Sequence, residues 1–157
     1  MSGLVGDNTA RASGVIAAAG GGKILQVVSV KDTGGPYTHS SNNWNAGGNG
    51  LTCTITPSAT SSKIYVSWVL GVYSGGDFAM SIFRDIGGAG ATNLGATGDN
   101  GLSRIQGKNS FGGGLVDSPN TTSAVEYMVY MNAIDGSTTS INYSSAYSYM
   151  SVMEIGA

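Results

Sequence analysis

Charge is scarce in this sequence. Only 10% of its 157 residues are Asp, Glu, Lys or Arg, whereas roughly 25% is usual in soluble domains. The seven cations are scattered and the net charge is −2, so the basic patch that marks a nucleic-acid-binding protein is absent. Gly, Ser, Thr and Asn supply the polarity instead. We therefore expect no nucleic-acid partner, and a surface suited to packing beside copies of itself or to exposure outside a cell.

Cysteine and histidine each occur once. A single Cys53 excludes an intrachain disulfide and a multi-cysteine metal site. Because it lies on the same apolar strand face as Leu51 and Ile55, we expect a buried, inert thiol. Any catalytic triad would have to use His39, and the sequence contains no Gly-x-Ser-x-Gly, His-Glu-x-x-His or phosphate-loop motif. The prediction is a protein that is not an enzyme, with no catalytic residue, cofactor or metal site.

Carboxylates near the expected strand ends could still meet in space, as a glycosidase requires. We interpret them as solvated turn residues; they are Asp77, Asp85, Asp99, Asp117, Glu126, Asp135 and Glu154. No targeting segment or membrane insertion is expected, since the N-terminus lacks a basic region and the apolar run Val15–Ala19 is too short.

Alternation of apolar and polar residues predicts strands throughout. One strand, which contains Leu51, Cys53 and Ile55, should end before Pro57, because proline has no backbone N–H to donate to a sheet. A second strand places Ile64, Val66, Trp68, Leu70 and Val72 on one face and Tyr65, Val69 and Tyr73 on the other. Further strands are predicted at 23–30, 78–85, 102–105, 111–119 (irregular, because of its glycines), 124–133, 140–144 and 149–155. With no helical periodicity, this pattern predicts an all-β fold: an antiparallel, jelly-roll-like β-sandwich of about eight strands.

Residues 1–22 do not resemble part of a sheet, whereas residues 23–157 form the predicted β-sandwich knob. The segment has two apolar pairs, Leu4–Val5 and Val15–Ile16, with Arg11 between them and a Gly-rich joint after them. It is interpreted as an extended N-terminal arm that docks on a partner, the alternative being a disordered tail.

The long loop Asp32–Gly50 contains Tyr37, His39 and Trp44, which could form an aromatic recognition surface or pack against the base of the loop.

The two longest strands carry apolar residues on both faces. Since an antiparallel sheet with one solvated face should alternate cleanly, we interpret the second apolar face as a subunit interface. Its candidate residues are Tyr65, Val69, Met128 and Tyr130, and the prediction is a homo-oligomer.

Four stretches occur in order: KILQVVS (23–29), ITPSATSSKI (55–64), LVDSPNTTSA (115–124) and MEIGA (153–157). This series resembles a domain of tail-fibre-like and other structural proteins of bacteriophages that infect cyanobacteria and marine bacteria. The opening GLVGDNTARASG (3–14) is also similar to the start of such proteins. The resemblance implies a non-enzymatic, β-rich homotrimer on the exterior surface of the virion. It departs from fibre members in lacking a long shaft before the domain.

Two functions are consistent with these observations. In the first, the protein is a capsid decoration, cement or head-fibre protein whose arm docks on another virion protein, such as the major capsid protein or a tail or collar component. In the second, it is a short tail-fibre tip that binds a host-surface glycan. The copy number per particle would distinguish them.

Overall fold

The computed structural model describes residues 22–45, 51–96, 98, 100–143 and 146–156. These residues form nine strands, all paired antiparallel, and no α-helix. The strands are β1 (Ile24–Asp32), β2 (Tyr37–His39), β3 (Thr52–Ile55), β4 (Lys63–Ile86), β5 (Thr92–Asn93), β6 (Ser103–Asp117), β7 (Val125–Ala133), β8 (Thr139–Ile141) and β9 (Ser148–Ile155). The predicted all-β antiparallel fold is confirmed. None of the described residues forms a helix of the length and apolarity needed to cross a membrane. The predicted arm, 1–22, lies outside the described residues except for Gly22.

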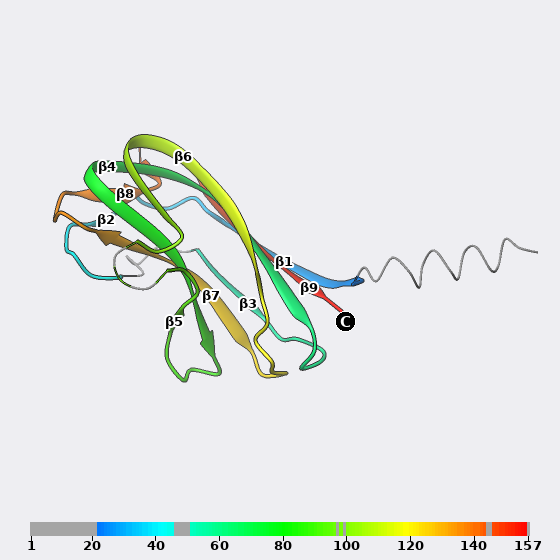
Figure 1. Ribbon diagram of the computed structural model, residues 1–157. Helices are drawn as coiled ribbons and strands as arrows, with labels where there is room; N and C mark the ends of the chain where they lie inside the picture. The colour runs from blue at the N-terminus through cyan, green and yellow to red at the C-terminus, as the bar shows by residue number, and fades with distance from the viewer. Residues whose placement is uncertain (1–21, 46–50, 97, 99, 144–145, 157) are drawn as a thin grey trace, which may run out of the picture.

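The 24-residue strand β4 belongs to both layers of the fold. Its first part pairs with β9 on one side and β6 on the other, and β1 pairs with β9. Its second part pairs with β7, and β3 pairs with β7. The register of the β4–β6 pair shifts between Ser74 and Phe78, where β4 passes from the first layer to the second. β4 and β6 curve together over the length of the molecule, while β1 and β9 run side by side to the C-terminus (Figure 1).

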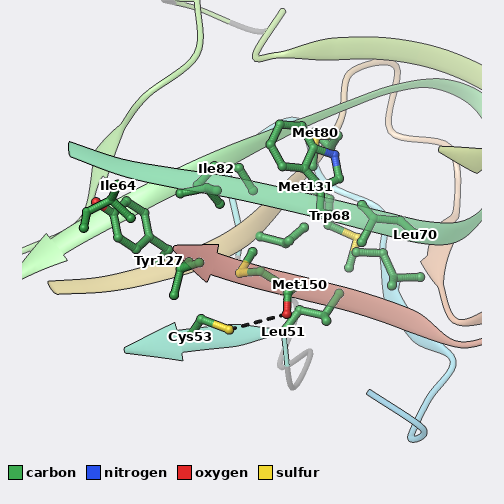
Figure 2. Close-up of a cluster of buried hydrophobic side chains, with 14 of the residues drawn as sticks. Leu51, Cys53, Ile64, Trp68, Leu70, Met80, Ile82, Tyr127, Met131 and Met150 are labelled. Carbon is green, nitrogen blue, oxygen red and sulfur yellow. Dashed lines mark hydrogen bonds between the residues drawn. The ribbon is translucent and has the colours of Figure 1, made fainter. Parts of the chain in front are cut away.

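The core lies between the two layers, as the alternation in β4 and β7 predicts. Apolar side chains of these strands meet those of β3 and β9 (Figure 2). Buried members include Leu51, Cys53, Ile64, Val66, Trp68, Leu70, Met80, Ile82, Tyr127, Val129, Met131, Met150 and Val152. β3 ends at Ile55, before Pro57, as expected. Alternation thus predicts the buried face correctly for β7 and for the first part of β4.

The prediction for the glycine-rich segment was wrong. Instead of a short strand at 102–105 and an irregular one at 111–119, the chain forms one strand, β6. Gly113 lies opposite Trp68, and a Cβ atom on Gly113 would stand 2.7 Å from Cζ2 of the indole. Gly114 lies under the phenol of Tyr65 on the other face. The glycines therefore make room for aromatic rings of β4 rather than interrupting the strand.

Two further boundaries differ from prediction. The strands expected at 64–73 and 78–85 are a single strand, because β4 continues through Gly75 and Gly76 as it changes layer. The loop Asp32–Gly50 contains β2, which pairs with β8. Both differences arise from pairing partners distant in sequence, which local patterns do not reveal.

Candidate functional site

The outward side of the first layer, here called the outer face, carries a continuous apolar row. Val27 faces Met153 across β1 and β9, and Met153 faces Tyr65 across β9 and β4. Tyr65 in turn faces Val116 on β6. Val27 is 53% exposed and Val116 is 57% exposed, so the row is open to solvent in the isolated chain. With the exposed Ile24 and Leu25 at the start of β1, it forms what we call the apolar band: Ile24, Leu25, Val27, Tyr65, Val116 and Met153.

A row of serines borders the apolar band. Ser29 and Ser151 face each other across β1 and β9 with their hydroxyl oxygens 2.7 Å apart. Ser67 continues the row on β4. Beyond the serines, Tyr149 and Val69 face each other and are again about half exposed. Six of the eight large exposed apolar side chains in the described part of the chain thus lie on this layer. Such a concentration is typical of an interaction surface.

The predicted interface residues separate into two groups. Tyr65 and Val69 lie together on the outer face, whereas Met128 and Tyr130 are on β7 in the second layer. There the Tyr130 ring stacks on Phe83 with centroids 4.0 Å apart, and Trp44 packs against Phe83 at 5.7 Å. The chain's own loop therefore covers part of the second layer. The structure brings Tyr65 and Val69 onto one surface but does not bring Met128 and Tyr130 to it.

The predicted recognition residues Tyr37, His39 and Trp44 each contact a different part of the chain. The Tyr37 hydroxyl lies 3.5 Å from a carboxylate oxygen of Asp32. Nε2 of His39 lies 3.0 Å from the backbone oxygen of Asn43. The Trp44 indole donates to the backbone oxygen of Gly98 at 3.0 Å. Tyr37 and His39 lie on the same side of β2, with Thr38 between them, while Trp44 packs against Phe83. The arm residues Leu4, Val5, Arg11, Val15 and Ile16 lie outside the described residues.

A buried carboxylate that the sequence analysis assigned to a solvated turn holds one end of the sandwich. Glu154 is 1% exposed. Its Oε1 accepts hydrogen bonds from the backbone N–H of Ser58 at 2.7 Å, the Ser58 hydroxyl at 2.6 Å and the Ser62 hydroxyl at 2.7 Å. Its Oε2 accepts one from Nε2 of Gln26 at 2.6 Å. The solvated-turn prediction was therefore wrong for Glu154.

The surroundings of Glu154 keep it ionised. Burial raises the pKa of this carboxyl, but the hydrogen bonds from Ser58, Gln26 and Ser62 outweigh burial and lower the pKa to about 2. The donors and the carboxylate come from three of the four stretches that carry the family resemblance: the donors are Gln26 from 23–29 and Ser58 and Ser62 from 55–64, and the acceptor Glu154 is from 153–157. Those stretches therefore serve the fold.

The fourth stretch supplies Asp117, the second internal carboxylate. Arg84 donates to both of its oxygens, at 2.8 and 3.0 Å, and the Tyr127 hydroxyl donates at 2.7 Å. Burial, together with the hydrogen bond to Asp117, raises the pKa of Tyr127. The cluster joins the end of β6 to β4 and β7. Asp117 is thus also a structural residue and not the solvated residue that was expected.

Cys53 and Asp135 are placed as predicted, whereas Asp77 and Asp85 in β4 and Glu126 in β7 are strand residues rather than turn residues. Cys53 is 2% exposed and its thiol lies 3.7 Å from the Met150 backbone oxygen (Figure 2). Burial raises the pKa of this thiol more than a backbone hydrogen bond involving Val30 lowers it. Asp135 lies in the exposed turn after β7, whereas Asp77 lies in β4 beside that turn. Hydrogen bonds lower the pKa of both carboxyls: Arg104 is the main donor to Asp77, and the Asp77 backbone N–H is the main donor to Asp135. Within the described ranges, no three His, Cys, Asp or Glu residues gather as a metal site would require.

Comparison with known proteins adds only limited information. No family model and no curated protein matches the sequence. Among solved structures, Eiger TNF from S. frugiperda is 11% identical, with a TM-score of 0.43 over 83% of this chain and 94% of that one. A chain from the viral particle of infectious bursal disease virus is 15% identical, with a TM-score of 0.41 over 87% and 36%. The insecticidal delta-endotoxin Cry8Ea1 from Bacillus thuringiensis is 16% identical, with a TM-score of 0.38 over 78% and 20%. The chain therefore spans about a fifth of the toxin and about a third of the viral chain.

Proposed function

We propose that this chain is a structural protein of a bacteriophage particle, displayed on the exterior of the virion as a capsid decoration, cement or head-fibre protein. The observation that carries the proposal is the apolar band. The core of the sandwich is complete without it, yet Val27, Tyr65, Val116 and Met153 form an unbroken row across four strands. A folded domain with such a row is suited to packing against another protein. The resemblance of the four sequence stretches supplies the viral context.

In this proposal the apolar band is the subunit contact of a homotrimer. Four strands spaced about 4.8 Å apart give the band a width of about 15 Å between the outer strand axes. Burying the exposed part of each large side chain contributes up to about 1.5–3 kcal/mol, so the six residues together can stabilise a contact between subunits. The threefold symmetry comes from the family resemblance, because the geometry of one chain does not set the number of copies.

The arm, residues 1–22, would anchor the assembled knob on another virion protein, such as the major capsid protein or a tail or collar component. Leu4, Val5, Val15 and Ile16 supply its apolar contacts and Arg11 a charge. A single arm should bind weakly, because fixing its backbone costs roughly 1–2 kcal/mol per residue. Three arms on one trimer attach avidly, since the first contact raises the effective concentration of the others.

The proposal assigns no catalytic activity to the chain. Three groups in the described part of the chain that could perform chemistry have structural roles that account for their placement. Glu154 joins β9 to the turn after β3, Asp117 joins β6 to Arg84 and Tyr127, and Cys53 packs in the core.

A short tail-fibre tip that binds a host-surface glycan is the second candidate. The exposed rings of Tyr147 and Tyr149, at the far end of the outer face, favour it.

Copy number in the particle tests the proposal and separates the two candidates. Particles of the phage that encodes the chain would be purified, and the chain quantified by mass spectrometry against the major capsid protein. A decoration, cement or head-fibre protein should be present in hundreds of copies, because it repeats over the capsid lattice. A few tens of copies at most would instead assign the chain to the tail fibre. Absence from purified particles would contradict both.

A further inference from the structure

Beyond the row of serines, the outer face ends in a group of aromatic and basic side chains. Lys31 faces Tyr149 across β1 and β9, and Tyr73 faces Lys108 across β4 and β6. The connection from β8 to β9 adds Tyr143 and Tyr147. We call this group the tyrosine–lysine end: Lys31, Tyr73, Lys108, Tyr143, Tyr147 and Tyr149.

Both lysines lie against tyrosine rings. Nζ of Lys31 is 4.2 Å from the ring centroid of Tyr147 and 5.7 Å from that of Tyr149. Nζ of Lys108 is 5.1 Å from the ring centroid of Tyr143, and that ring stacks on Tyr73 at 4.6 Å. These cation–π contacts hold the ammonium groups beside the rings while leaving N–H donors available.

Neither ammonium group has a carboxylate partner within the described part of the chain. The ion pairs found there join Arg84 to Asp117 and Arg104 to Asp77. Lys31 and Lys108 are both exposed. The tyrosine–lysine end therefore offers two positive charges, placed beside aromatic rings, that form no ion pair with any described residue.

Two hollows adjoin these side chains, one on each side of Ala146. The first is lined by Gly71, Lys108, Asn109, Ser110 and Tyr143 among others. The second is lined by Thr33, the segment Gly34–Pro36, Asn142 and Tyr147. Aromatic faces, amides, hydroxyls and an ammonium group thus converge on one surface. Val69 faces Tyr149 of the first lysine–tyrosine group, and Tyr73 belongs to the second. These two residues of β4 are four positions apart, which corresponds to about 13 Å along the strand. A ligand that contacts both groups must therefore be longer than one sugar ring.

We propose that the tyrosine–lysine end binds an acidic polysaccharide that carries carboxylated sugars. Tyrosine rings would pack against the C–H faces of the sugar rings, the two ammonium groups would donate to carboxylates, and Asn109 and Ser110 would bond to hydroxyls. A neutral glycan would leave the lysines without partners. Nucleic acid is disfavoured, since two lysines on a chain of net charge −2 are few for binding dominated by phosphate contacts. The site does not depend on where in a virion the chain resides.

Polygalacturonate is a suitable probe, with highly methyl-esterified pectin as the neutral control of the same backbone. In native affinity electrophoresis, polygalacturonate should retard the full chain and the methyl ester should not. Lys31→Met and Lys108→Met should each weaken binding by about tenfold, because each loses a charge-assisted hydrogen bond. Tyr143→Ala should also weaken binding. Lys63→Met is the matched control, since Lys63 is exposed at the start of β4, away from the tyrosine–lysine end, and it should bind like the parent chain.

Three results would overturn the proposal: no retardation by polygalacturonate, equal retardation by the methyl ester, or equal loss of binding in Lys63→Met. Retardation by an oligothymidylate probe as strong as that by polygalacturonate would also overturn it, in favour of general polyanion binding. Circular dichroism of each variant separates loss of the site from loss of fold. None of these results depends on copy number in a particle, so this inference and the proposed function can fail separately.

Discussion

At the scale of single residues, Glu154 shows how a buried charge can stabilise this fold. Burial alone would favour its neutral form, but three donor side chains and a backbone N–H favour the carboxylate. The pKa is about 2 in the folded chain, against an ordinary value of 4.5. Because the folded-state pKa is the lower of the two, the carboxylate stabilises the fold above pH 4.5. This contribution is lost as the pH falls from 4.5 through about 2.

Replacing Glu154 with Gln should therefore change how stability depends on pH. At pH 7, well above both pKa values, Glu154→Gln should lower the free energy of unfolding by about 3 kcal/mol, because an amide cannot accept all the donors around it. Between pH 5 and pH 2 the parent chain should lose stability more steeply than the variant. Urea unfolding at several pH values measures both. Glu126→Gln, at a half-buried carboxylate on β7, is the control and should keep the parent's slope. Parallel curves for the parent and Glu154→Gln would refute this role.

The same residue shows what local sequence can and cannot predict. The alternation of Met150, Val152 and Glu154 places the carboxylate on the buried side of its strand, so its burial was predictable. Its donors Ser62, Ser58 and Gln26 are 92, 96 and 128 positions away. Their meeting depends on strand pairing, which spacing along the chain does not specify. For the same reason alternation placed Tyr65 and Val69 correctly on an outward face, but could not separate them from Met128 and Tyr130.

At the scale of elements, the paired strands β4 and β6 organise the molecule. They link the two layers, and each contributes residues to the outer face. Glycines in β6 were interpreted as breaks because a strand interior usually disfavours them. In this strand both glycines lie against aromatic rings of the neighbour: Gly113 faces the buried indole of Trp68, which requires a glycine, and Gly114 lies beside the hydroxyl end of the Tyr65 phenol.

A matched pair of substitutions tests this explanation of the glycines. Gly113→Ala should destabilise the chain by about 1–3 kcal/mol, because the added methyl meets the Trp68 indole, which is 5% exposed and cannot move away. Gly114→Ala should be nearly neutral, since the added methyl meets the hydroxyl end of the half-buried Tyr65 side chain, which can shift. Thermal unfolding of both variants measures the difference. Equal melting temperatures would show that the Trp68 contact does not require glycine.

At the scale of the whole molecule, the serine row divides the outer face into two regions of different character. The apolar band lies on one side, at the end where Glu154 joins β9 to the turn after β3. The tyrosine–lysine end lies on the other. In our account the first region assembles the chain with its copies and the second remains open to a ligand. Both regions are built on strands of one layer, so assembly and binding can coexist on a single trimer.

The most direct test of self-assembly through the apolar band is the mass of the full chain in solution, measured by light scattering after size exclusion. The account predicts about three times the chain mass of 15.8 kDa. The double substitution Val27→Lys with Val116→Lys places charges in the band at exposed positions. It should give a monomer whose cooperative melt persists, while Leu102→Lys, at an exposed leucine outside the band, should remain a trimer. A dimer would contradict the threefold symmetry implied by the resemblance. The account as a whole would be contradicted if the parent chain were a monomer that unfolds cooperatively, or if it were a trimer that the double substitution leaves intact.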